Sequence, residues 1–530
     1  MRTLFSTLSI SLLLCQSVFG AYMVEAPAEL QHTCEAFLAD QPSRSGKDTA
    51  DALRKHLVDK GYTFAQVSIG FKNNRNILVV KEGKIGKATY TGNQFLSSAG
   101  ISEYINWKEG DSFNFGRFQK STATLNRKKF VEVDTKLTPV RGEDGEILVN
   151  ADFSVDDTIP LTGSINVRGD SAFVDNYRNN YRSTLSLEYW EPFFSTDRIG
   201  LSVSTDPDTP SELLSASLNY KFRPKEYSQV IYGGYSDSDK DLGPDSLPEA
   251  SLPFSSFISP DSQTFYVGYQ GFYGLPIPFI KDISLLYGAT YLDTTQKSQL
   301  FAGDKKLALI LPRIGLRGSF KNPSFSGHGN NFWSVTYTHD VDTDQADLVD
   351  RSDYAGNNFY YIDLHFSTYQ PLFINTTSLG GLLARINGRF TDGLIPQMVR
   401  YRVGGGFPGT GTVRGYTEGE FVGDRGFTLN FEYRYREVEF ALGGLNLHIQ
   451  PFIFYDFGYI ENLDSSFNGT FLNESSDLQS VGLGINGNLL TDLDFSLTAG
   501  APMVDGFEGE SGLKSEKWQP RVNLDLSWKF

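Results

Sequence analysis

The most regular pattern in the chain is an alternation of apolar and polar residues over short segments, and it dominates the sequence after Asp157. From Phe427 to Arg436, apolar side chains take the odd positions and polar side chains the even positions. The same two-residue period recurs in residues 184–189, 214–222, 492–499 and 522–530. Successive side chains of a strand point to opposite faces, so each segment is predicted to be a β-strand with one apolar and one polar face.

Before Asp157 the pattern is mixed. Residues 47–61 carry apolar side chains at helical spacing and stop at a glycine, and two strand-like segments follow. A second unit then has the order β-α-α-β-β, with a charged loop, 141–145, between its last two strands. The pattern predicts small α+β modules at the N-terminal end, followed by an all-β region.

The first twenty residues follow neither of these two patterns. Arg2 precedes an apolar run at 10–14, and small residues follow at Gly20-Ala21, which predicts a secretory signal peptide in residues 1–20. The apolar run is too short for a good membrane-spanning helix, and no later run reaches about 18 apolar residues. If the mature chain enters a membrane, it must do so as a closed β-barrel, because only helices and closed barrels satisfy their backbone polar groups in lipid.

Composition agrees with a barrel. Aromatic residues make up 14% of the chain although mean hydropathy is only −0.28, as expected when the apolar positions alternate with polar ones. A secreted soluble β-sandwich would also alternate. The aromatic-rich apolar phase and the final strand, which ends on Phe530, favour the barrel. Residues 159–530, at a little over 20 per strand and loop, predict about 16 antiparallel strands.

The net charge and the reactive residues argue against several classes of function. The net charge is −16, and no basic stripe indicates nucleic acid. Cys15 lies in the predicted signal peptide, which leaves Cys34 as the only thiol and no intramolecular disulfide. The six histidines form no ligand-spaced cluster, so no metal or other cofactor is expected. No nucleophile-base arrangement or carboxylate pair can be assigned as catalytic, so we expect no enzyme.

Two motifs stand out in the all-β region. The glycine-rich segment GGGFPG (404–409) precedes VRGY, which is Val413, Arg414, Gly415 and Tyr416. Further charged residues follow it: Glu418, Asp424, Glu432 and Arg434. The second motif, F-x-D-x-G, is Phe454, Asp456 and Gly458. Asp456 lies in the polar phase of its strand, and a carboxylate facing lipid is costly, so it is predicted to face the lumen.

These paired motifs, in this order, resemble the two-partner secretion transporters (TpsB-type, related to haemolysin activators and filamentous-haemagglutinin transporters). Their superfamily also contains the barrel-assembly insertases. The resemblance implies two periplasmic POTRA modules, at 21–85 and 86–158, then a 16-stranded barrel at 159–530. It also implies that the loop at 404–426 folds back into the lumen, where Arg414 pairs with Asp456. Arginine suits this role because its planar fork meets a carboxylate through two charge-assisted bonds.

Many members of that family also carry a helix that plugs the pore. Only residues 21–46 are available for it here, and the first POTRA module needs them. We therefore expect no separate plug helix and an abbreviated first module.

The resemblance implies an outer-membrane pore that translocates one dedicated, unfolded exoprotein of the haemolysin or adhesin type to the cell surface. The exoprotein would bind the POTRA modules, and outer-membrane lipids would surround the barrel. The barrel-assembly machinery would recognise Phe530 as a C-terminal signal. The sequence contains no ATP motif, so folding of the exoprotein outside would drive transport. An insertase or assembly factor of the same superfamily is the alternative, although such members typically have more POTRA modules. A soluble secreted binding protein or hydrolase is a further alternative.

Overall fold

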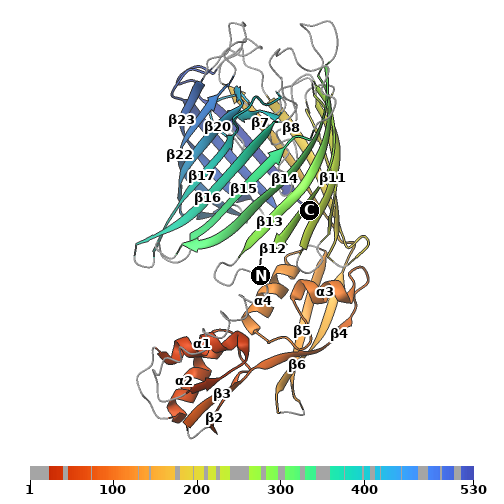
Figure 1. The fold of residues 1–530 in the computed structure, drawn as a ribbon, viewed down its shortest axis with the longest axis vertical. Helices are drawn as coiled ribbons and strands as arrows, with labels where there is room; N and C mark the ends of the chain where they lie inside the picture. Colours follow the sequence, from red (N-terminus) through yellow and green to blue (C-terminus); the bar gives the residue numbers. More distant parts are fainter. Residues whose placement is uncertain are drawn as a thin grey trace, which may run out of the picture. The chain divides into compact units, whose positions relative to one another are not determined.

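The computed structural model divides near Pro160 into two compact units, an N-terminal α+β unit and a C-terminal barrel (Figure 1). The structure describes residues 23–39, 46–72, 75–128, 130–142, 145–172, 180–194, 196–207, 210, 213–222, 227–238, 262–275, 282–296, 305–322, 329–341, 359–374, 377–396, 399–405, 412–417, 419–442, 445–463, 475–489, 492–506 and 515–530. The predicted signal peptide lies outside these residues. No helix among them is both long and apolar enough to cross a bilayer.

The first module contains five elements: β1 (Met23–Glu25), α1 (Ala28–Ala39), α2 (Gly46–Asp59), β2 (Gln66–Lys72) and β3 (Arg75–Lys81). Strand β3 is central, with β1 parallel on one side and β2 antiparallel on the other. The two helices and the sheet share one apolar core, in which Leu30 and Cys34 of α1 meet Leu53 of α2 and Leu78 of β3. Burial of these side chains from water is what holds the small sheet and its helices together.

The sequence predicts an abbreviated first module, and this prediction is wrong. All five elements of the β-α-α-β-β order are present. The sequence prediction overlooked β1, which has only three residues and therefore shows no readable alternation. Helix α1 contributes fully buried residues to the core, so it is part of the module rather than a separate segment.

The second module repeats this topology with β4 (Gly83–Thr91), α3 (Ser98–Ile105), α4 (Phe115–Asn126), β5 (Val131–Arg141) and β6 (Ile147–Asp157). Here β6 is central, parallel to β4 and antiparallel to β5. Helix α3 begins where Ser97 accepts a hydrogen bond from the Gly100 amide, and it ends at Asn106, whose φ of 58° is left-handed. The ring of Trp107 packs edge-on against Phe153 in the core.

The C-terminal unit is a closed antiparallel barrel. Its strands are β7 (Leu161–Ala172), β8 (Asn180–Trp190), β9 (Arg198–Thr205), β10 (Leu213–Phe222), β11 (Tyr227–Ser238), β12 (Ser262–Gly274), β13 (Ile283–Gln296), β14 (Lys305–Asn322), β15 (Gly329–His339), β16 (Tyr360–Ile374), β17 (Thr377–Phe390), β20 (Arg425–Tyr435), β21 (Val438–Leu442), β22 (Leu445–Glu461), β23 (Ser475–Leu489), β24 (Leu493–Pro502) and β25 (Arg521–Lys529). Strand β25 pairs with β7 and closes the ring.

Strands β20 and β21 occupy one position, because both pair with β22. The described strands of the barrel therefore fill sixteen positions. The predicted fold class, α+β modules followed by a barrel of about 16 antiparallel strands, is confirmed. Closure of the sheet excludes the β-sandwich alternative.

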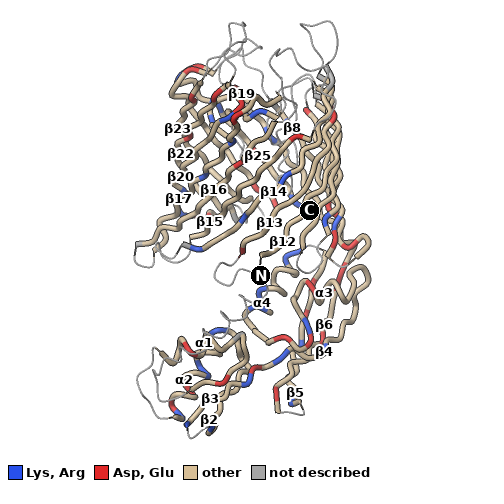
Figure 2. The backbone as a smooth tube through the Cα atoms, in the orientation of Figure 1, with Lys and Arg blue, Asp and Glu red and all other residues tan. Residues whose placement is uncertain are grey.

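The two phases of each strand face different environments. Large apolar side chains of one phase are exposed on the outer wall, among them Leu218, Phe265, Phe431, Ile453 and Leu483. The other phase points inward and is largely polar and buried, as at Ser202, Ser217, Thr290, Thr428 and Ser480. Along the barrel strands most positions carry no charge (Figure 2). An apolar outer wall and a polar interior are what lipid requires of a membrane barrel.

Candidate functional site

The site is built on the connection between β17 and β20, whose described residues 391–396, 399–405, 412–417 and 419–424 lie inside the barrel. Two short strands in it, β18 (Tyr401–Val403) and β19 (Phe421–Gly423), pair with each other. They pack against the inner wall through a buried cluster: Tyr401, Val403, Val413, Tyr416, Ile460 and Leu478. Since Ile460 and Leu478 belong to β22 and β23, this wall is the platform on which the VRGY segment lies.

Arg414 makes a bidentate ion pair with Asp456 of β22. Its Nε and Nη2 donate to the two carboxylate oxygens, each over 2.7 Å. The Arg414 backbone amide donates to the same carboxylate over 3.0 Å. Both side chains are buried, with Asp456 completely inaccessible. Two parallel charge-assisted bonds fix orientation as well as distance, so the contact sets where the loop sits on the wall.

A second carboxylate shares the arginine. The third guanidinium nitrogen of Arg414, Nη1, donates to Glu432 of β20 over 2.7 Å. The other oxygen of Glu432 accepts from Arg434 over 2.8 Å. The network thus contains two arginines and two carboxylates and has no net formal charge. A buried group of charges is tolerable only when each is paired and hydrogen-bonded in this way.

Aromatic rings form the floor under the arginine. The Arg414 guanidinium lies 3.6 Å from the ring centre of Phe454, where the negative face of the ring attracts a cation. A Cβ at Gly482 of β23 would lie 2.3 Å from the Phe454 ring, and one at Gly484 would lie 2.3 Å from the Phe452 ring. The two glycines therefore leave the space that these inward-facing rings occupy.

The next two motif residues contact β23, β24 and the residues that follow β24. Gly415 has a φ of +94°, and a Cβ there would lie 2.9 Å from the backbone of Gly500. Only glycine combines this backbone conformation with so close an approach. The Tyr416 hydroxyl is buried 2.8 Å from the Gln479 carbonyl and 2.7 Å from the Val504 carbonyl. The VRGY segment is thus held to three neighbouring strands, β22, β23 and β24.

The remaining predicted residues have different positions. Gly458 lies beneath the loop, where a Cβ would lie 2.3 Å from a Val403 methyl carbon and 2.8 Å from one of Val413. Asp424 is fully buried at the end of the loop, where it pairs with Arg400. Glu418 lies outside the described residues, as do 406–409 of the GGGFPG segment.

Sequence reasoning did not identify Asn430 as part of the site. Its side-chain amide donates to Asp456 and to the Thr412 carbonyl, both over 2.9 Å. It therefore ties wall and loop together beside the ion pair. Asn430 is in the polar phase of β20 and lies opposite Asp456 in the strand register. A sequence alignment of these two strands as neighbours would therefore have placed it beside the ion pair.

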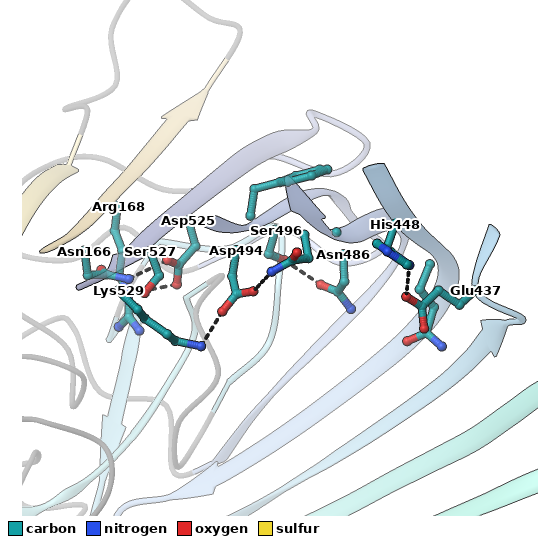
Figure 3. Close-up of a pocket in the computed structure, with 14 residues that line it drawn as sticks. Asn166, Arg168, Glu437, His448, Asn486, Asp494, Ser496, Asp525, Ser527 and Lys529 are labelled. Atoms are coloured by element: carbon teal, nitrogen blue, oxygen red, sulfur yellow. Dashed lines mark hydrogen bonds and ion pairs between the residues drawn. The ribbon is translucent and has the colours of Figure 1, made fainter. Parts of the chain in front are cut away.

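The inner wall also contains a cavity of about 540 Å³, shown in Figure 3. Polar side chains that line it pair with each other: Arg168 with Asp525 over 3.0 Å, and the His448 ring with Glu437 over 2.9 Å. Amides and hydroxyls fill the space between them, as at Asn486 and Ser496. Within the described ranges, no group of three or more His, Cys, Asp or Glu residues could hold a metal ion.

Phe530 lies at the seam where the barrel closes. Its backbone amide donates to the Gly163 carbonyl over 2.9 Å, and its carbonyl accepts from the Gly163 amide over 2.8 Å. A Cβ on Gly163 would lie 2.4 Å from the Phe530 ring, so the ring covers that glycine. The final aromatic residue is thus paired with β7, the first strand of the barrel.

Comparison with known proteins gives one family. Residues 328–487 match the model of the haemolysin secretion/activation proteins ShlB/FhaC/HecB. The match covers less than a third of the chain, but it contains the returning loop, Arg414, Glu432 and Asp456. No curated protein matches the sequence.

Three solved structures share the fold over 96% of this chain. CdiB from Escherichia coli has a TM-score of 0.65 at 15% identity, with 90% of that chain covered. CdiB from Acinetobacter baumannii has a TM-score of 0.59 at 14% identity, with 89% covered. BamA from Haemophilus ducreyi lacking POTRA domains 1–3 has a TM-score of 0.54 at 14% identity, with 100% covered. The family match and the fold together confirm that this chain resembles the two-partner secretion transporters, outer-membrane β-barrels with POTRA modules at their N-terminal end.

Proposed function

We propose that this protein is the outer-membrane pore through which one dedicated exoprotein leaves the periplasm in an unfolded state. The observation that carries the proposal is the buried contact of Arg414 with Asp456 and Glu432, within the segment that matches the secretion/activation family. The contact holds a loop inside the lumen, and a loop held by exchangeable polar bonds can give way to a chain in transit. The POTRA modules would receive the exoprotein before it enters the barrel.

The test uses the host strain and the gene for the long repetitive exoprotein that we expect beside this one. Deleting the transporter gene should leave the exoprotein in the periplasm and remove it from the cell surface and medium. Immunoblots of the cell fractions measure this. A plasmid copy of the full transporter should restore export.

The same deletion distinguishes the insertase alternative. A secretion pore serves one partner, so the amounts of unrelated outer-membrane barrels should stay unchanged when the transporter is removed. Quantitative proteomics of the outer-membrane fraction measures them. A general fall in barrel proteins, with the exoprotein still exported, would replace our proposal with a role in barrel assembly.

A second proposal concerns assembly of the protein itself. We infer that the barrel-assembly machinery recognises the aromatic end of β25. Deleting Trp528–Phe530 should lower the amount of heat-modifiable barrel in the membrane several-fold. Phe530→Ala separates recognition from pairing, because it removes the ring and keeps both backbone hydrogen bonds to Gly163. Normal assembly of both variants would show that the aromatic end is incidental.

A further inference from the structure

The inner face of strand β14 changes character along its length. Arg313 is buried, and its guanidinium donates to Gln270 of β12, so the odd positions of β14 face the lumen. The even positions carry large apolar side chains that are exposed on the outer wall: Ile310, Ile314, Leu316 and Phe320. The first inward side chains that the structure describes are apolar and buried: Leu307, Leu309 and Leu311. The charged inward residues that follow them are all basic: Arg313, Arg317 and Lys321.

The basic part of β14 lies toward the periplasmic end of the barrel. Strand β7 begins at Leu161, directly after the second module ends at Asp157, so the end of the barrel where β7 begins is the periplasmic one. Neighbouring strands are antiparallel, and β14 takes the eighth position when β7 is counted as the first. Strand β14 therefore runs toward the periplasmic end. An exoprotein that enters from the periplasm would pass the basic residues before it reaches the apolar ones.

Residues of two other strands extend this basic surface. Arg385 of β17 lies opposite Asn430 of β20 in the strand register. Since the Asn430 side chain reaches Asp456 in the lumen, Arg385 faces inward as well. The Arg317 guanidinium lies 3.5 Å from the ring centre of Phe272 of β12, where the face of the ring attracts a cation. We call the inward face of strands β11 to β17 the basic wall.

The basic wall carries an excess of positive charge. Its inward side chains that the structure describes include five cations and one carboxylate, a net formal charge of +4: Arg313, Arg317, Lys321, Arg385, Arg389 and Asp363. Strands β14 and β25 are eight positions apart in a ring of sixteen, so β25 and its neighbours form the facing wall. The described inward side chains of β22 to β25 include two cations and three carboxylates: Arg521, Lys529, Asp456, Asp494 and Asp525. Positive charge is thus concentrated on one side of the lumen, in a protein whose net charge is −16.

We propose that the basic wall makes the lumen selective for anions, and that it binds acidic segments of the exoprotein as they enter. The inference rests on the proposed secretion function and deepens it, because it names the chemistry of the chain in transit. Cations that line a lumen raise the local concentration of anions, because the low-dielectric protein around them focuses their field. Since Arg313, Arg317 and Lys321 are four residues apart, an extended acidic segment would meet a cation about every 13 Å along β14. The Arg414 network on β20 and β22 is neutral while it is intact, so it adds nothing to this preference.

Planar-bilayer recordings of the purified full chain test the selectivity without any exoprotein, so a failed secretion assay would not affect the result. In a KCl gradient at low ionic strength, the reversal potential of the wild type should show a preference for chloride. A triple variant, Arg317→Gln with Lys321→Gln and Arg385→Gln, should lower the chloride-to-potassium permeability ratio about threefold or more. The matched control combines Arg168→Gln with Asp525→Asn, which removes one charge of each sign from another part of the wall, and should leave the ratio unchanged. Arg317→Lys keeps the charge and should also leave it unchanged.

Binding of a labelled poly-aspartate peptide tests the second part of the proposal. Fluorescence anisotropy with the full chain in lipid nanodiscs measures it, and the pore need not conduct. Poly-aspartate should bind the wild type and the control variant equally, and the triple variant about tenfold more weakly. Poly-lysine should show no such loss.

Two results would overturn the proposal. A reversal potential that does not favour chloride would contradict the selectivity, and equal binding of poly-aspartate to the wild type and the triple variant would contradict the binding of acidic segments. Heat-modifiability shows whether each variant has assembled. Should the triple variant fail to assemble, Arg317→Gln and Lys321→Gln take its place singly, each with a smaller effect in the same direction. No change in either of them would likewise contradict the role.

Discussion

Arg414→Ala should abolish secretion while the barrel still assembles, and its effect should exceed that of Asp456→Ala. Removing the arginine leaves the completely buried Asp456 without its ion partner and takes one of two arginines from Glu432. Removing Asp456 leaves Arg414 paired with Glu432. Breaking a buried pair costs about 3–5 kcal/mol, and water in the lumen reduces this. Export per assembled barrel, from immunoblots of medium and membrane, measures the effect.

The double variant tests whether the two residues act through one contact. Once Arg414 is gone, loss of Asp456 removes nothing more from the pair, so the double variant should be little worse than Arg414→Ala. Arg168→Ala, which breaks a pair in the wall away from the loop, should export normally. Losses that simply multiply, or normal export by Arg414→Ala, would show that the contact does not position the loop.

Gly415→Ala should reduce secretion nearly as much as Arg414→Ala, although it changes no charge. The added Cβ would lie 2.9 Å from the carbonyl carbon and oxygen of Gly500, and the φ of +94° disfavours any L side chain. Backbone atoms of a barrel strand cannot turn aside as a flexible side chain can. Residues 412–417 must therefore shift off β24, which also pulls Tyr416 from its two carbonyls. We expect at least a tenfold loss of export at equal barrel amounts.

Two other glycines provide controls that separate backbone strain from steric clash of the added Cβ. Gly110 has a φ of +89° but nothing within 4 Å of an added Cβ, so Gly110→Ala carries the backbone strain alone. Gly393 is in the same inward connection and also has open space around it, so Gly393→Ala carries neither. Both should export close to normally. If Gly110→Ala fails as badly as Gly415→Ala, general instability explains the result and the contact with Gly500 does not.

Periodicity was enough to predict the barrel, because its strands are long and their two faces meet different solvents. It failed for β1, since three residues contain too little alternation to recognise. Strand count was predictable to the extent that the loops have similar lengths. The break between β20 and β21, which share one position opposite β22, leaves no clear signal in the sequence.

The site was partly readable for a different reason. Arg414 and Asp456 belong to short motifs, and the polar phase of β22 placed the aspartate in the lumen. The ion pair of Arg389 in β17 with Asp363 in β16 was not identified, because each residue is one more polar position in an alternating strand. They meet because the strand register sets them directly opposite each other, and the returning loop brings the Val399 carbonyl to the same arginine. Neither fact is local in sequence.

The neutrality of the Arg414 network has a consequence for ion flow. Displacement of the VRGY segment from the wall would remove one positive charge, that of Arg414, while Glu432, Asp456 and Arg434 stay on the wall. That part of the wall would then change from neutral to a formal charge of minus one, and the potential beside it would become attractive to cations. An open pore should therefore be more cation-selective than a closed one at low ionic strength, where screening is weak. Basic segments of a passing chain would be drawn along this wall, and acidic segments would be slowed there.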